Sequence, residues 1–304
     1  MRSLTNAILV LLLVASASAQ SSPAKPDPKP DPKPDKPAAS ASMNLPSEAT
    51  VDSFLQQQFG YQEGLSWRIN SIKPASVAGM AEVTAVMATA EGQQLFHFFV
   101  APDGEHAVVG DIIPFGARPF DPVKKMLDKG ITGPDRGPKN SPLTIVEFGD
   151  LQCPACKAAQ PTIEALIAVE PTAHFVFQNF PLEMHNWAAK GAAYADCVGR
   201  ASNDAFWKFI SKTYETQADI TAATADEKLT AIADQSGVKG ADIAACAAQP
   251  ETKARVDASI ALGKSVEITG TPTLFINGRK ISSFDPNLSA VYKSLVDFAA
   301  RPAN

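Results

Sequence analysis

Two cysteines separated by a dipeptide carry the strongest chemical signal in the sequence. Cys153 and Cys156 enclose a Pro-Ala pair, and this spacing lets the two sulfur atoms reach each other across the first turn of a helix. Because a thiolate is the nucleophile in thiol–disulfide exchange, such a pair can pass a disulfide to or from another protein. The alternatives are a purely structural disulfide or half of a zinc site.

Zinc is the weaker of these interpretations. A zinc site needs a second close pair of cysteine or histidine ligands. The remaining cysteines, Cys197 and Cys246, lie far apart in the sequence, and no histidine stands beside either of them. We therefore expect no metal and a redox role for the first pair.

The segments around the pair predict how the two sulfurs are held. Residues 143–148 are typical of a buried strand, and residues 154–169 have the pattern of a helix. The pair thus falls at a helix start, where unpaired N–H groups and the helix dipole favour a thiolate and lower the thiol pKa below its usual value of about 8.5. Cys153 is predicted to be the more exposed, attacking sulfur and Cys156 the resolving sulfur.

The rest of this region predicts the architecture that carries the pair. A second strand at 174–179 follows the helix, and a strand–helix–strand order implies a parallel pair. Residues 185–265 read as helical, and a hairpin of strands 273–276 and 279–281 and a closing helix at 288–300 come after them. The helix starts within the helical stretch are expected near Asn203, Thr224, Lys239 and Glu251. The predicted fold class is α/β, a short mixed sheet with a helical insertion.

The N-terminal segment predicts export. Residues 1–19 combine a positive start, an apolar run and an Ala-Ser-Ala cleavage site, so they read as a signal peptide cleaved after Ala19. The apolar run is shorter than the about 20 residues that cross a membrane, and a retained anchor is the alternative. We expect a protein of the periplasm or cell envelope.

Three further segments lead up to the redox region. Residues 20–43 alternate Pro with Lys and Asp, which predicts a disordered, extended linker; a ligand for a proline-binding domain is the alternative. Residues 44–120 predict a small α+β accessory domain, with a helix near its start followed by strands at 83–89, 94–100 and 107–109. Residues 121–140 read as a connector in which glycines and prolines break regular structure.

Composition excludes several other classes of protein. The chain of 304 residues is 45% hydrophobic and 19% charged, which is ordinary for a globular protein. Its net charge is −5, and no basic block points to nucleic acid. We therefore expect no nucleic-acid partner.

Two segments resemble a known family. Residues 148–156, Phe-Gly-Asp-Leu-Gln-Cys-Pro-Ala-Cys, resemble the active-site segment of DsbA-like thioredoxin-fold proteins, in particular the branch that includes BdbD. Residues 270–278, Gly-Thr-Pro-Thr-Leu-Phe-Ile-Asn-Gly, resemble the cis-proline loop of the same family. The resemblance implies a thioredoxin fold with a helical insertion over residues 141–304, preceded by the small α+β domain.

The resemblance also assigns roles to three residues outside the cysteine pair. It implies that Pro272 is a cis-proline facing the sulfurs and that Thr271 tunes the redox potential and substrate release. It implies that Glu147 is a buried acid that relays the proton of Cys156. The plain alternatives are a trans-proline at a strand start and a strand-end carboxylate. His185, in the loop after the second strand, receives no catalytic role.

The implied function is that of an exported thiol–disulfide oxidoreductase. It would introduce or exchange disulfides in exported proteins that carry free thiols, without a cofactor, and a membrane partner would reoxidise or reduce it. The Pro-Ala dipeptide replaces the Pro-His of strongly oxidising DsbA proteins, so the potential could be less oxidising than about −120 mV. The alternatives are a disulfide reductase or isomerase, and a non-catalytic thioredoxin-fold chaperone or metal carrier.

The two remaining cysteines suggest a second pair. Both Cys197 and Cys246 fall in the predicted helical insertion, and disulfides persist in exported proteins. We expect a structural disulfide between them, with two buried free thiols as the alternative.

Overall fold

The computed structural model describes residues 45–90, 92–110, 112–281 and 289–301. The predicted signal peptide and proline-rich linker therefore lie outside the described residues. None of the described helices combines the length and apolar character that a membrane crossing requires.

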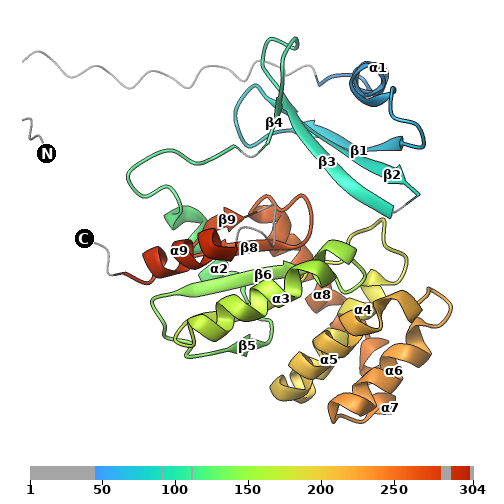
Figure 1. Ribbon diagram of the computed structural model, residues 1–304, viewed down its shortest axis with the longest axis vertical. Coiled ribbons are helices and arrows are strands. Elements are labelled where there is room, and N and C mark those ends of the chain that lie inside the picture. The colour runs from blue at the N-terminus through green and yellow to red at the C-terminus, as the bar shows by residue number, and fades with distance from the viewer. Residues whose placement is uncertain (1–44, 91, 111, 282–288, 302–304) are drawn as a thin grey trace, which may run out of the picture. The chain divides into compact units, whose positions relative to one another are not determined.

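An antiparallel sheet and one helix make up the first part of the described chain (Figure 1). Ser47 caps the helix, since its Oγ accepts a hydrogen bond from the backbone N–H of Thr50 at 3.1 Å. The apolar side of the helix packs on one face of the sheet, where Leu55 and Phe98 are buried. In sheet order the elements are β1 (Ser66–Pro74), β2 (Ala81–Thr89), β3 (Gly92–Val100) and β4 (Ala107–Val109), with α1 (Glu48–Phe59) against them.

Strand β1 was not predicted from the sequence. Among the described strands it is an edge strand that pairs with β2, and its exposed and half-buried residues alternate over the first six positions. Polar residues and a terminal proline, which an edge tolerates, give it a weak strand pattern.

The predicted connector contains a helix. Helix α2 (Asp121–Gly130) has a proline in its first turn and buries Leu127. The expectation of a segment without regular structure was wrong for this half, because the glycines that break helices begin only at Gly130. Beyond it lies the two-residue strand β5 (Asp135–Arg136).

The second sheet has five strands in the order β5-β7-β6-β8-β9. Strands β6 (Thr144–Gly149) and β7 (His174–Asn179) are parallel, and α3 (Pro154–Val169) connects them. Strand β8 (Thr273–Ile276) is antiparallel to β6 and forms a hairpin with β9 (Arg279–Ile281). The hairpin turns at Asn277 and Gly278, whose φ angles of 47° and 83° are those of the predicted Asn-Gly turn. This mixed sheet matches the predicted fold class.

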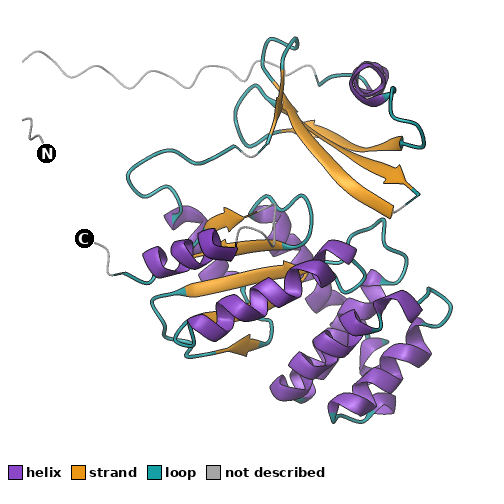
Figure 2. Ribbon diagram, in the orientation of Figure 1, coloured by secondary structure: helices purple, strands orange, loops and turns teal. Residues whose placement is uncertain are grey.

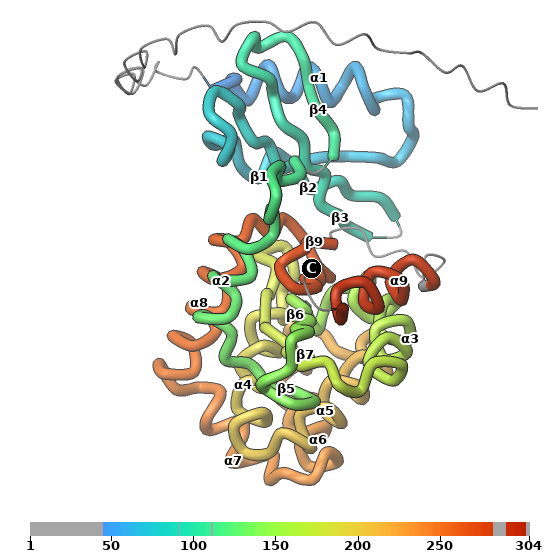
Figure 3. Tube along the Cα trace, turned by 90° about the vertical axis from the view of Figure 1, so that its left-hand side faces the viewer, coloured from blue at the N-terminus to red at the C-terminus, as the bar shows by residue number. Residues whose placement is uncertain are grey.

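Helices cover both faces of this sheet. Figure 3 shows α3 and α9 (Ser289–Ala299) on one side and α2 and α8 (Pro250–Ser265) on the other. Successive side chains of β6 point to opposite faces of the sheet. Ile145 packs with side chains of α3 and α9 on one face, and Phe148 packs with those of α2 on the other.

The helical insertion stands beside the sheet (Figure 2). Four of its helices start within one residue of the positions expected from the sequence, and its first helix starts three residues after His185. The structure contains the expected disulfide between Cys197 and Cys246, which joins two of these helices. The helices are α4 (Ala188–Ala201), α5 (Asn203–Glu215), α6 (Ala225–Ser236), α7 (Gly240–Ala247) and α8.

Candidate active site at the start of helix α3

The cysteine pair lies at the N-terminus of α3, as the sequence indicates. Cys153 is the N-cap residue and Pro154 begins the helix, so Cys156 falls in its first turn. Cys153 is 6% exposed and Cys156 is fully buried. Cys153 is thus the more exposed of the two sulfurs, as predicted.

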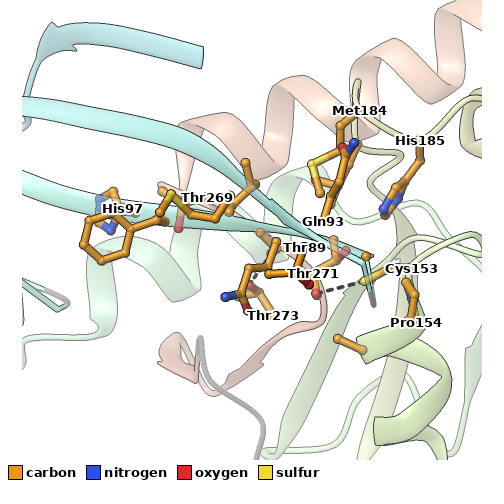
Figure 4. A pocket seen from close by; sticks show the side chains of 18 of the residues that line it. Thr89, Gln93, His97, Cys153, Pro154, Met184, His185, Thr269, Thr271 and Thr273 are labelled. Carbon is orange, nitrogen blue, oxygen red and sulfur yellow. Dashed lines mark hydrogen bonds between the residues drawn. The ribbon is translucent and has the colours of Figure 1, made fainter. Parts of the chain in front are cut away.

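The loop before β8 meets this helix start. Because β8 runs antiparallel to β6, with Thr273 opposite Phe148, the beginning of β8 lies where β6 ends and α3 follows. The Thr271–Pro272 peptide bond is cis, as the resemblance implies. The Sγ of Cys153 is 3.3 Å from the carbonyl oxygen of Thr271, to which the thiol donates a hydrogen bond (Figure 4). Residues 118 positions apart in the sequence are thus in direct contact.

The environment separates the pKa values of the two thiols. A hydrogen bond from the Cys156 side chain is the largest influence on Cys153, and with help from Thr271 it outweighs burial and lowers the pKa of Cys153 to about 6. The Oγ1 of Thr271 is buried and has no hydrogen-bond partner among the described residues, so it is available to a thiolate. Burial, and then the neighbouring Cys153, raise the pKa of Cys156 well above its ordinary value. One sulfur is a thiolate at neutral pH and the other keeps its proton.

The alkylation rate of the reduced protein is expected to report this separation. Iodoacetamide reacts with thiolates, so its rate should rise with a midpoint near pH 6, the pKa of Cys153. Cys156 should stay unmodified across neutral pH, because it is buried and protonated. Peptide mapping after alkylation identifies the modified sulfur. A single midpoint above pH 8 would contradict the expected thiolate.

Glu147 is buried beneath this site. It lies on β6 with 1% of its surface exposed, and its Oε1 accepts a hydrogen bond from Nε2 of Gln160 at 2.9 Å. Burial raises the pKa of Glu147 to about 8, although the hydrogen bond from Gln160 acts in the opposite direction. Glu147 therefore carries a proton at neutral pH and can release it slightly above, which suits a proton relay.

Replacing this acid with glutamine is expected to stabilise the protein. In the unfolded chain Glu147 ionises near pH 4.5, whereas in the folded protein it keeps its proton up to about pH 8. The folded state therefore binds the extra proton between these values, and its stability falls as pH rises through this window. Glu147→Gln should remove that slope and add about 3 kcal/mol at pH 7, since one pKa unit corresponds to about 1.4 kcal/mol.

Urea denaturation of wild type and variant between pH 5 and pH 8 measures this effect. Glu227→Gln is the control, because Glu227 is exposed on α6 and the slope should survive there. Parallel stability curves for wild type and Glu147→Gln would contradict the buried, protonated acid.

Other polar groups around the cysteines were missed by the sequence analysis. The side chain of Gln217 donates hydrogen bonds from Nε2 to the carbonyl oxygens of Leu151 and Cys153, at 2.8 and 3.1 Å. The buried Tyr214 hydroxyl donates to the carbonyl of Asp150 at 3.4 Å. No sequence signal marks Gln217 or Tyr214, because both belong to the helical insertion and reach the site only through the fold.

The described residues hold no group of three or more His, Cys, Asp and Glu side chains arranged for a metal ion. The cysteine pair stands as two unbonded thiols in this structure.

These features together define a thioredoxin-fold protein: the mixed sheet, the crossover helix, the cysteine pair at its start and the cis-proline loop that meets it. A family model described as "Thioredoxin" matches residues 129–296, which is more than half of the chain, so the chain belongs to this family. Among curated proteins it is 30% identical over 168 residues to disulfide bond formation protein D of Bacillus subtilis, covering 50% of this chain and 70% of that protein. The predicted resemblance to the branch that includes BdbD is confirmed.

Two further comparisons show how much of each protein is covered by the similarity. The chain is 30% identical over 149 residues to the Na(+)/H(+) antiporter NhaA 1 of Salinispora arenicola, but this match spans 48% of the chain and only 22% of the antiporter. The structure of the thiol-disulfide exchange protein alpha-DsbA2 from Wolbachia pipientis superposes with a TM-score of 0.50 at 22% identity, over 60% of this chain and 99% of that one. This last comparison supports the fold.

Proposed function

We propose that the protein is a thiol–disulfide oxidoreductase that passes a disulfide between its Cys153–Cys156 pair and other proteins. The observation that carries this proposal is the reactive sulfur itself. Cys153 sits at a helix start, in contact with the loop of the cis Thr271–Pro272 bond, and its pKa is lowered to about 6. The similarity to disulfide bond formation protein D of Bacillus subtilis points the same way.

The exchange proceeds in two substitutions at sulfur. A substrate thiolate attacks Cys153 of the oxidised pair, forming a mixed disulfide and releasing Cys156 as a thiolate that takes up a proton. A second substrate thiolate attacks the substrate sulfur of the mixed disulfide, which forms the substrate disulfide and releases Cys153 as a thiolate. Burial of Cys156 directs the first attack to Cys153.

We assign supporting roles to three residues. Glu147 supplies the proton that Cys156 takes up and receives it in the reverse direction, which its raised pKa near 8 favours. The carbonyl oxygen of Thr271 accepts the hydrogen of the Cys153 thiol, and the Thr271 side-chain hydroxyl stabilises the thiolate. Pro272 keeps the backbone beside the sulfurs without an N–H group, so neighbouring backbone is free to pair with an extended substrate.

The acidity of Cys153 supports a moderately oxidising protein. A stabilised thiolate favours the reduced form and raises the potential. A pKa of about 6 lies between the about 7 of thioredoxin and the about 3.5 of DsbA. We therefore infer a potential between about −270 and −120 mV, the values for those two proteins.

Export completes the proposal. Residues 1–19 would direct the chain to the periplasm or cell envelope, and residues 20–43 would serve as a linker that holds the folded part away from a surface or partner. Residues 44–120 would form an accessory domain and residues 141–304 the catalytic domain. Exported proteins with free thiols would be the substrates, and a membrane protein would reset the pair.

Disulfide transfer from the oxidised protein tests the function. The protein, oxidised and freed of excess oxidant, is mixed with a reduced unfolded protein whose activity needs disulfides, and returning activity is followed. Equilibration in glutathione buffers gives the potential of the pair. Transfer with a potential in the inferred range supports the proposal, whereas a potential near −270 mV would favour a reductase. No transfer in either direction would leave a binding protein as the better reading.

A further inference from the structure

We propose that His185 is a positioning residue for the exchange reaction: through its ion pair with the buried Asp150 it supplies the positive charge that offsets this carboxylate beside the Cys153 thiolate. The inference rests on the proposed function, because it concerns the same sulfur. Neither residue has another assigned role.

Asp150 is hydrogen-bonded to both cysteines. Its carbonyl oxygen accepts a hydrogen bond from the N–H of Cys153 at 3.0 Å, and its own N–H donates to the Sγ of Cys156 at 3.5 Å. Its side chain is completely buried. The carboxylate accepts hydrogen bonds from the backbone N–H groups of Gln152 and Leu182, at 2.8 and 2.9 Å. This carboxylate is therefore fixed in place next to the reactive sulfurs.

A negative charge at this position works against the chemistry. The charge of Asp150 raises the pKa of Cys153 and so disfavours the thiolate. The dipeptide between the cysteines, Pro154 and Ala155, has no ionisable side chain. A charge that offsets Asp150 must come from another segment of the chain.

His185 supplies it from the loop between β7 and α4. Its Nδ1 is 2.7 Å from Oδ2 of Asp150, and its side chain is only 10% exposed. Burial alone would lower the pKa of His185, but the hydrogen bond and charge of Asp150 outweigh burial, and the pKa is raised above its ordinary value. The cationic form is therefore favoured towards neutral pH.

The effect of His185 extends to Cys153. Both residues line the same cavity, and Figure 4 shows His185 beside the start of α3. The negative charge of Cys153 raises the pKa of His185, and because an interaction between two titrating groups is mutual, protonated His185 lowers the pKa of Cys153. Asp150 and Cys153 are the two ionisable groups that act on His185, and neighbouring Glu183 is exposed.

Two substitutions separate charge from shape. His185→Gln keeps a hydrogen-bond donor for Asp150 but is neutral at every pH, whereas His185→Lys keeps the charge and changes the shape. In His185→Gln the midpoint of Cys153 alkylation should rise by up to one pH unit, and the equilibrium constant for oxidising glutathione should fall up to tenfold, or about 30 mV. His185→Lys should keep both values near those of the wild type.

His174→Gln is the matched control. His174 pairs with Asp135 through Nε2 at 3.0 Å and is similarly buried, with 12% of its side chain exposed. It begins β7, at the opposite end of the parallel β6–β7 pair from the cysteines. Any destabilisation should be similar in His174→Gln, but the alkylation midpoint and the potential should not move.

The measurements decide the matter without a substrate assay. A wild-type midpoint in His185→Gln, or an equal shift in His174→Gln, overturns the proposal. If His185→Gln does not fold, a raised midpoint in His185→Lys overturns it and an unchanged one supports it. If the wild-type protein transfers no disulfide, the proposed function is refuted instead, because the alkylation titration requires no disulfide transfer.

Discussion

Replacing Cys153 with serine is expected to lower the rate of disulfide exchange by about a thousandfold or more, because a nucleophile that acts as a unit with its neighbours leaves little activity when removed. A serine hydroxyl stays protonated at neutral pH, and its oxygen cannot take part in a disulfide. The site itself should persist, since the serine hydroxyl can still donate to the Thr271 carbonyl oxygen that Cys153 contacts at 3.3 Å. The transfer assay described above measures the loss.

Cys156→Ser is the informative companion to this variant. It keeps the nucleophile but removes the sulfur that closes the Cys153–Cys156 bond and releases the substrate in the reverse direction. Mixed disulfides that form when the Cys153 thiolate attacks a disulfide of an oxidised substrate protein should therefore persist. These adducts are visible on non-reducing gels and disappear when a reductant is added. Two results in the Cys153→Ser variant would contradict the assignment of the attacking sulfur: an undiminished transfer rate, or adducts that form at Cys156.

Removing the second disulfide is expected to lower the free energy of unfolding substantially. The bond between Cys197 and Cys246 spans 49 residues and connects α4 with α7. A loop of this length limits the unfolded chain enough to stabilise the fold by about 4 kcal/mol in the loop-entropy account. The double variant Cys197→Ala, Cys246→Ala should therefore lower the free energy of unfolding by about this amount in urea denaturation.

The redox chemistry should survive this change. The bond lies within the helical insertion, whereas the reactive sulfurs belong to the start of α3. The alkylation midpoint of Cys153 in the double variant should therefore remain near pH 6. An unchanged free energy of unfolding, or a shifted Cys153 alkylation midpoint, would contradict a purely structural role for this disulfide.

Local patterns predicted the parts of the site that are close together in the sequence. The strand, the cysteine pair and the helix succeed one another within residues 143–169, and each has its own signal in composition or spacing. The cis-proline loop was recognised by its resemblance to known loops. Its contact with Cys153 follows from the sheet order, which a strand pattern leaves open.

The missed features depend on tertiary contacts. Asp150 and His185 are 35 residues apart, and neither residue type suggests a buried ion pair until the loop after β7 is placed. Glu147 is the contrasting case: its burial, which raises its pKa, was expected from the family resemblance alone, because a single carboxylate in a strand does not reveal it. Strand β1 gave a weak pattern because a bulge between Ile69 and Ser71 interrupts its alternation of polar and apolar residues.

The order of the chain has a consequence for synthesis. The ribosome delivers Cys153 well before Thr271, its contact 118 positions later, and all of α4 to α8 is made in between. A nascent chain therefore carries its sulfur pair without the loop that faces it. The contact that holds the Cys153 sulfur is therefore absent from every nascent chain that stops short of Thr271.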